Sequence, residues 1–115
     1  MYFKVSRALL MPGLVGLAIV DSFVAGTPLF TTDIQSHSPE ISYLAHGTNG
    51  VMTSFSVNHY ADAVAGFFES AEQQQRLQMG CQRSVELYTL DHMVSNFTMG
   101  IKSCLCIEGF QGRYR

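Results

Sequence analysis

Four histidines are the residues best suited to acid–base or metal chemistry in this chain. They are His37, His46, His59 and His92, and no two of them lie within eight residues of each other. A zinc site normally includes two ligands only a few residues apart, so the spacing predicts no metal site. The chain also lacks the Gly-x-Gly-x-x-Gly motif of dinucleotide-binding loops, and we expect no cofactor.

A catalytic site would have to be assembled by the fold from residues that are distant in the sequence. The candidates are His46, His59 and His92, with Asp91 as a partner that could orient a histidine base. Adjacent side chains in a turn rarely face each other, so we do not expect Asp91 to orient His92 as a catalytic base. We therefore expect no catalytic residues, although the sequence leaves an enzyme possible.

Three cysteines, Cys81, Cys104 and Cys106, are the other reactive groups. An odd number in a secreted chain leaves one thiol over after intramolecular pairing. We expect a disulfide from Cys81 to either Cys104 or Cys106, because a bridge within the Cys-x-Cys pair would be strained. The remaining thiol is a candidate for a disulfide-linked dimer. The pair lacks the two-residue separation typical of redox and zinc motifs.

Asn96-Phe97-Thr98 is the one N-glycosylation triplet of the chain. Polar and apolar residues alternate around it, which places Asn96 and Thr98 on the polar face of an expected strand, opposite Phe97. The sequence therefore predicts a glycoprotein in which Asn96 is exposed to solvent.

These interpretations depend on residues 1–26, which have the pattern of a secretory signal peptide. Lys4 and Arg7 precede an apolar run over residues 8–20, and small residues lead to an expected cleavage site after Gly26. Such a leader predicts an extracellular protein, exposed to conditions in which cysteines pair and Asn-x-Thr triplets are glycosylated.

Two other interpretations fit this segment less well. An uncleaved membrane anchor needs about 20 consecutive apolar residues, and Asp21 ends the apolar run before that length is reached. A core helix of a cytosolic protein would not need the basic flank of Lys4 and Arg7. Contact with a membrane is expected only if the leader is retained.

Charge argues against nucleic acid as a partner. After Gly26 the chain has five basic residues against eight acidic ones, without a basic cluster. Binding to nucleic acid or to anionic lipid by charge alone requires clustered lysine and arginine. The 115-residue chain is long enough for one small domain behind its leader.

Hydropathy patterns divide the rest into an extended or disordered segment over residues 27–40 and an α+β domain over residues 41–115. Alternation on both sides of Asn49-Gly50 predicts a β-hairpin. An apolar stripe predicts a helix from Asn58 to Met79, ended by Gly80. Three more strands are expected over residues 85–89, 93–101 and 104–108.

The resulting order, β-β-α-β-β-β, predicts a small antiparallel sheet packed against one amphipathic helix. We expect a small secreted protein without catalytic activity that acts through a binding surface. An effector-like, toxin-like or ligand-binding protein with a protein or cell-surface partner fits this expectation. The alternatives are a secreted hydrolase that uses the candidate histidines and a membrane-tethered protein with an uncleaved leader.

Overall fold

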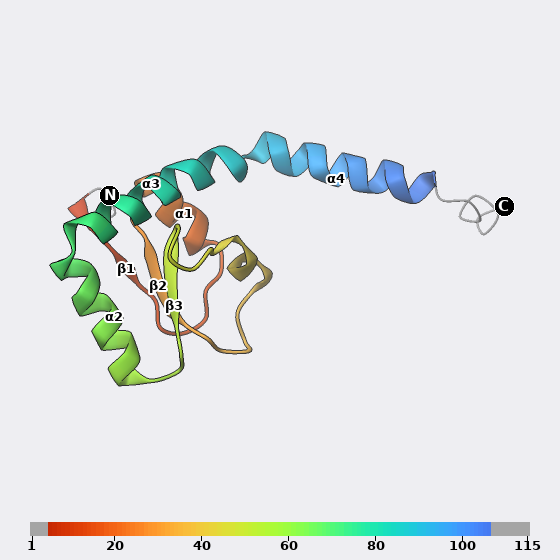
Figure 1. The fold of residues 1–115 in the computed structure, drawn as a ribbon. Coiled ribbons are helices and arrows are strands. Elements are labelled where there is room, and N and C mark those ends of the chain that lie inside the picture. The colour runs from red at the N-terminus through yellow and green to blue at the C-terminus, as the bar shows by residue number, and fades with distance from the viewer. Residues whose placement is uncertain (1–4, 107–115) are drawn as a thin grey trace.

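A computed structural model describes residues 5–106 of the chain (Figure 1). Three short strands and several helices alternate along it. In chain order they are β1 (Leu9–Leu10), α1 (Ala18–Ala25), β2 (Leu29–Thr32), the 3-10 helix η2 (Pro39–Tyr43), β3 (Gly50–Thr53), α2 (Val57–Glu69), α3 (Ala71–Leu87) and α4 (Leu90–Leu105).

The three strands form one parallel sheet in the order β1-β2-β3. In its register Phe30 of β2 lies between Leu10 of β1 and Val51 of β3. Parallel neighbours need a crossover connection. Helix α1 lies in the crossover from β1 to β2, and η2 lies in the connection from β2 to β3.

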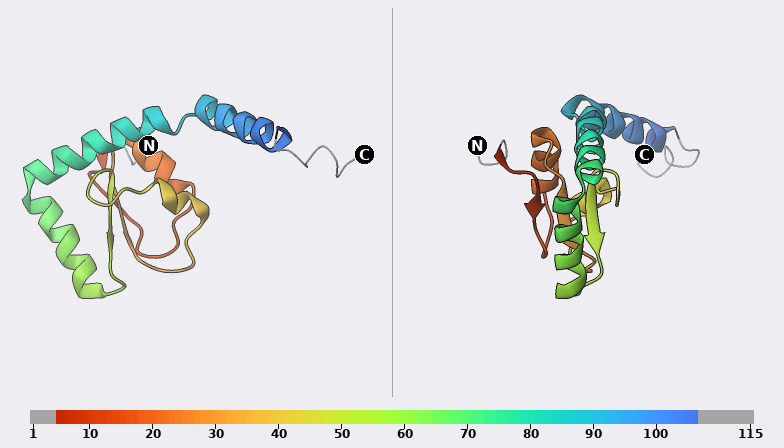
Figure 2. Two further views of the ribbon diagram at one scale, coloured as in Figure 1. Left: turned by 45° about the vertical axis from the view of Figure 1, so that its right-hand side comes forward. Right: turned by 60° about the vertical axis from the view of Figure 1, so that its left-hand side comes forward.

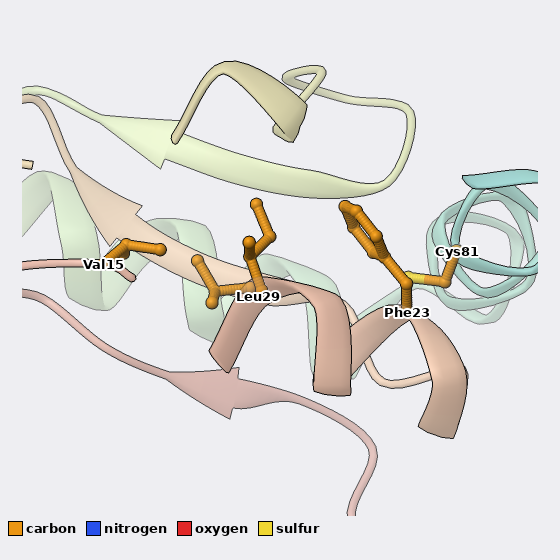
Figure 3. Packing of buried hydrophobic residues seen from close by; sticks show 5 residues of the cluster. Val15, Phe23, Leu29 and Cys81 are labelled. Atoms are coloured by element: carbon orange, nitrogen blue, oxygen red, sulfur yellow. The ribbon is translucent and has the colours of Figure 1, made fainter. Parts of the chain in front are cut away.

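Helices cover both faces of the sheet, and the core is divided accordingly. On one face Val15 and two residues of α1, Ile19 and Phe23, pack with Leu29 of β2 and Cys81 of α3. Figure 3 shows this cluster, with Cys81 approaching Phe23 from α3. On the other face a second cluster of buried side chains combines the sheet with α2 and α3; its members are Phe30, Val51, Phe67 and Leu77.

The predicted antiparallel sheet is wrong, because all the strand pairs of the described residues are parallel. A strand does form at β3, but Asn49-Gly50 is not a hairpin turn. The Asn49 side chain is buried and bonds to the backbone of Ala45 and Tyr43. It thereby closes a loop that directs the chain back alongside β2.

The predicted helix over residues 58–79 is two helices, separated at Ser70. The Ser70 side chain accepts a hydrogen bond from the Gln73 amide and so caps α3. Gly80 does not end this helix, which continues to Leu87. It lies against the backbone of Thr48, where a side chain would not fit.

The strands predicted over residues 85–89 and 93–101 are also wrong, since these residues lie mainly in α3 and α4. Met93, Phe97 and Ile101 fit a period of two, but they equally fit the spacing of three to four residues of a helix. The Thr89 side chain accepts a bond from the His92 amide at the start of α4, which selects the helix. The strand predicted over residues 104–108 begins inside α4, and residues 107–115 lie outside the described residues.

The segment interpreted as a leader contributes two elements of this fold, β1 and α1. Cleavage after Gly26 would remove Val15, Ile19 and Phe23 from the core, so this fold and a cleaved leader exclude each other in one mature chain. Secretion and the leader stay predictions. Among the described residues no helix is both long enough and apolar enough to cross a membrane.

The packing of α3 against the loop before β3 can be tested at Gly80. A Cβ atom there would lie 1.7 Å from the Thr48 carbonyl oxygen, a backbone atom that cannot move alone. We expect Gly80→Ala to lower the free energy of unfolding by about 1–3 kcal/mol or more, measured by urea denaturation. The control is Gly66→Ala in α2, where a Cβ atom meets nothing within 4 Å. It should stabilise the protein by up to about 1 kcal/mol, and equal effects of the two changes would contradict the packing.

Candidate functional site

The carboxyl ends of the three strands lie at one edge of the sheet, because the strands are parallel. The chain leaves this edge through residues 11–17 after β1, residues 33–38 after β2 and residues 54–56 after β3. In open parallel sheets, ligands bind outside the carboxyl ends of the strands, in a crevice where the strand order reverses; the order β1-β2-β3 of the described residues has no such reversal. We call this edge of the sheet the carboxyl edge.

Two threonines at the end of β2 hold the connection from β1 to α1 in place. The Thr32 hydroxyl donates to the Pro12 carbonyl at 2.5 Å, and the Thr31 hydroxyl donates to the Gly13 carbonyl at 3.3 Å. Both threonines are buried. Buried hydroxyl groups need hydrogen-bond partners. These two bonds therefore satisfy both threonine hydroxyls and position the loop between β1 and α1.

His37 joins the same two segments. Its Nδ1 atom accepts a hydrogen bond from the Val15 amide at 3.1 Å, and its Nε2 atom lies 2.7 Å from the Thr32 carbonyl oxygen. The first bond leaves Nδ1 without a proton, so the ring carries its proton on Nε2 and donates it to Thr32. His37 is therefore a structural histidine that pins the loop before α1.

The loop between β1 and α1 presents unused amide groups. Within the described residues, the amides of Gly13, Leu14 and Gly16 have no hydrogen-bond acceptor. A Cβ atom on Gly13 would meet nothing within 4 Å, so the space beside it is open. Backbone amides without an acceptor can donate hydrogen bonds to an anionic or strongly polar group.

A pocket of about 300 Å³ lies at the carboxyl edge. Its lining is almost entirely apolar and comes from the end of β2, the loops after β1 and β3 and the start of α2; the residues are Pro12, Thr32, Phe55, Ser56, Val57 and Tyr60. The Tyr60 hydroxyl donates to the Phe30 carbonyl at 3.0 Å, which holds its ring at the pocket wall. Burial raises the pKa of Tyr60 above its ordinary value.

The mouth of this pocket is apolar and open. Phe55 is 78% exposed and Val57 is 85% exposed. The Ser56 side chain does not cap α2, so the first amides of that helix have no side-chain acceptor. The carboxyl edge thus combines an apolar pocket with unpaired amides of the loop before α1 and with the uncapped first turn of α2.

The structure does not bring the candidate catalytic histidines together. His46 lies before β3, where its Nδ1 atom accepts from the Met52 amide at 3.0 Å. His59 lies in the first turn of α2 and is hydrogen-bonded to the Ser54 hydroxyl. His92 lies in α4 beside Asp91, and its Nδ1 atom donates to the Leu87 carbonyl at 3.0 Å. The described residues contain no group of three or more potential metal ligands.

His59 is the one candidate histidine at the carboxyl edge. Its contact with Ser54 joins a hydroxyl group to a potential base, but the described residues add no third side chain hydrogen-bonded to the His59 ring. A hydrolase built from His46, His59, His92 and Asp91 is not supported by this arrangement, and it stays a prediction.

The cysteines are unpaired in this structure. Cys81 is fully buried and its thiol donates to the Asn49 carbonyl at 3.3 Å, whereas Cys104 and Cys106 are exposed at the far end of α4. A disulfide from Cys81 to either would require α4 to fold back along α3, and it stays a prediction. Burial raises the pKa of Cys81 from 9.0 to about 12. The stability that its neutral thiol contributes is complete below pH 9 and is lost as the pH rises towards 12.

Asn96 is exposed, but on a helix and not on the predicted strand. Its glycosylation stays a prediction.

No protein-family model matches the chain, and no curated protein matches it.

Most of the carboxyl edge was missed in the sequence. Gly13 and Gly16 lie in the segment interpreted as a leader, and Thr31, Thr32 and His37 lie in the segment interpreted as extended or disordered. The signal that could have found them is the pair of glycines between a short apolar run and the helical pattern over residues 18–25, an arrangement typical of a strand, a loop and a helix.

The state of the cysteines can be tested by counting reactive thiols. At about pH 8 a buried thiol with a raised pKa reacts slowly with dithionitrobenzoate, whereas Cys104 and Cys106 are open to the reagent. We expect two thiols to react in the native protein and the third only after denaturation. A native protein with fewer than two reactive thiols would instead support a disulfide.

Proposed function

We propose that this protein is a ligand-binding module whose carboxyl edge holds a small molecule with an apolar ring and an anionic group, of the class of nucleoside diphosphates. The observation that carries the proposal is the apolar pocket of about 300 Å³ at the carboxyl edge, formed by β2, α2 and the loops that follow β1 and β3. Pockets of this size with a few polar groups at the rim are typical of small-molecule sites.

The apolar pocket accounts for the ring. Phe55, Val57 and Tyr60 offer flat or branched apolar surface, and two of them are exposed to solvent at the mouth. Burial of that surface by a ligand is worth roughly 25 cal/mol for each Å² removed from water. An aromatic base fits this chemistry better than a compact, strongly hydrated ligand.

Amides without acceptors account for the anionic group. Those of Gly13, Leu14 and Gly16 lie in the loop before α1, and the first turn of α2 has no side-chain cap. The amino ends of α1 and α2 also carry partial positive charge. Gly13-x-x-Gly16 is not the Gly-x-Gly-x-x-Gly motif of dinucleotide-binding loops. The proposed anion site is therefore supported by the position of the unpaired amides and not by a sequence motif.

Ligand binding is one of the functions predicted from the sequence, and the carboxyl edge favours it over the others. The pocket is formed by side chains from β2, from α2 and from the loops after β1 and β3, which suits a small molecule. Effector-like or toxin-like action and a cell-surface partner stay predictions.

The proposal predicts that ADP, GDP, UDP and CDP, titrated one at a time by calorimetry, include at least one that binds. Because the ring and the anionic group use different parts of the site, the matching nucleoside and inorganic pyrophosphate should each bind more weakly than the intact nucleotide. We expect Val57→Asp to weaken binding at least about tenfold, since it places a carboxylate at the pocket mouth.

The control variant is Ala71→Asp, which adds the same charge to the exposed first turn of α3, outside the pocket lining and outside the proposed anion site. Both acids lie in the first turn of a helix and should stabilise that helix slightly, so binding lost in Val57→Asp alone is not lost folding. Absence of binding by all four nucleotides, or equal losses in the two variants, would contradict the proposal.

A further inference from the structure

Helix α4 is the one long element of the described residues that packs on nothing. All of its residues are exposed, and it projects beyond the domain (Figures 1 and 2). A helix of this length is marginal in water without tertiary packing. The C-cap residue of α3, Tyr88, is anchored to the domain: its ring stacks on Tyr43 at 4.4 Å between ring centroids and on Phe23 at 6.1 Å.

One side of α4 is an apolar stripe, formed by residues three or four positions apart. Its members are half to three-quarters exposed; they are Leu90, Met93, Val94, Phe97, Ile101 and Leu105. A groove of about 450 Å³ runs along the stripe at Gly100, where the missing side chain leaves space. An amphipathic helix of this kind normally has its apolar side covered.

Two charges flank the stripe. Asp91 and Lys102 are the charged residues of α4 with histidine neutral, and they are eleven positions apart. Eleven residues make about three turns, so the two side chains lie on the same flank near opposite ends. The single lysine does not suit binding to an anionic membrane, which requires several basic residues.

We infer that α4 pairs with α4 of a second copy of this chain in antiparallel orientation. In an antiparallel pair related by a two-fold axis, the same flank of each helix lies against the other. Asp91 of each copy then faces Lys102 of the other, and the midpoint falls between Asn96 and Phe97. A parallel pair would place this flank against the opposite one, which has no charged residue.

The same register fits the groove. Pairing about that midpoint places Met93 of one copy opposite Gly100 of the other, where the groove is open. Phe97 of each copy meets the other at the two-fold axis. The two domains lie at opposite ends of the pair, because each is attached to the amino end of its own α4. The charges and the groove therefore favour the same arrangement, an antiparallel pair centred between Asn96 and Phe97.

The test is sedimentation equilibrium of the full chain, produced without glycosylation and kept reduced, between about 1 and about 300 µM. We expect a reversible equilibrium between monomer and dimer. Phe97→Glu should weaken it at least about thirtyfold, as loss of a central aromatic contact does. The control is Met99→Glu, which places the same charge on the opposite side of α4 and should leave the equilibrium unchanged.

A charge exchange tests the orientation. Asp91→Lys should weaken the dimer about tenfold, because it creates two repulsive pairs. Adding Lys102→Asp should restore the dimer, although both changes oppose the dipole of α4 and weaken the isolated helix. If the double variant dimerises again, the gain cannot come from a more stable isolated helix. It would show that residues 91 and 102 of different copies lie opposite each other.

Three outcomes would overturn the inference. They are a monomer at every concentration, a dimer unaffected by Phe97→Glu, and a dimer in which the double charge exchange fails to restore what Asp91→Lys removes. Formation of a Cys104–Cys104 disulfide on oxidation would also count against it, since antiparallel pairing keeps these thiols roughly 20 Å apart.

Discussion

The complete burial of β2 is the constraint on which the rest of the structure depends. Leu29, Phe30, Thr31 and Thr32 are all buried, so the strand needs a covering layer on both faces. The segment over residues 15–23 supplies most of one layer, and α2 with α3 supplies the other. A chain without β1 and α1 would expose Leu29 and Thr31, with no other described segment to replace that layer.

The same constraint builds the carboxyl edge. Thr31 and Thr32 bring two hydroxyl groups into the interior, and each unpaired buried group would cost about 1–3 kcal/mol. The carbonyl groups of Pro12 and Gly13 accept these hydrogen bonds. The hydrogen bonds that satisfy the buried threonines thus also hold the loop with the unpaired amides in place. The proposed site requires no further structural element to position this loop.

Local patterns gave correct elements only where a single period fits the residues. Tyr60, Val64 and Phe67 have helical spacing alone, and they lie in α2. Phe97 and its neighbours fit both periods, and here capping by Thr89 decides for a helix. Strand direction cannot be read from alternation at all, because it depends on the crossover that carries the chain between strands.

The candidate site was missed for a different physical reason. An apolar run of this length is typical of a signal peptide and also of a short buried strand followed by a helix. Lys4 and Arg7 favoured the first interpretation, which removed Gly13 and Gly16 from consideration. Of the predicted catalytic candidates, only His59 lies at the carboxyl edge, since its position after β3 is set by the sheet.

Native-state hydrogen exchange of the full chain tests the central claim most directly, which is that residues 9–26 belong to the folded domain. We expect the amides of Val20 to Phe23 in α1 to exchange as slowly as those of β2, because the two elements bury each other and open together. Exchange of α1 at the rate of an unfolded chain, while α3 and β3 stay protected, would contradict it.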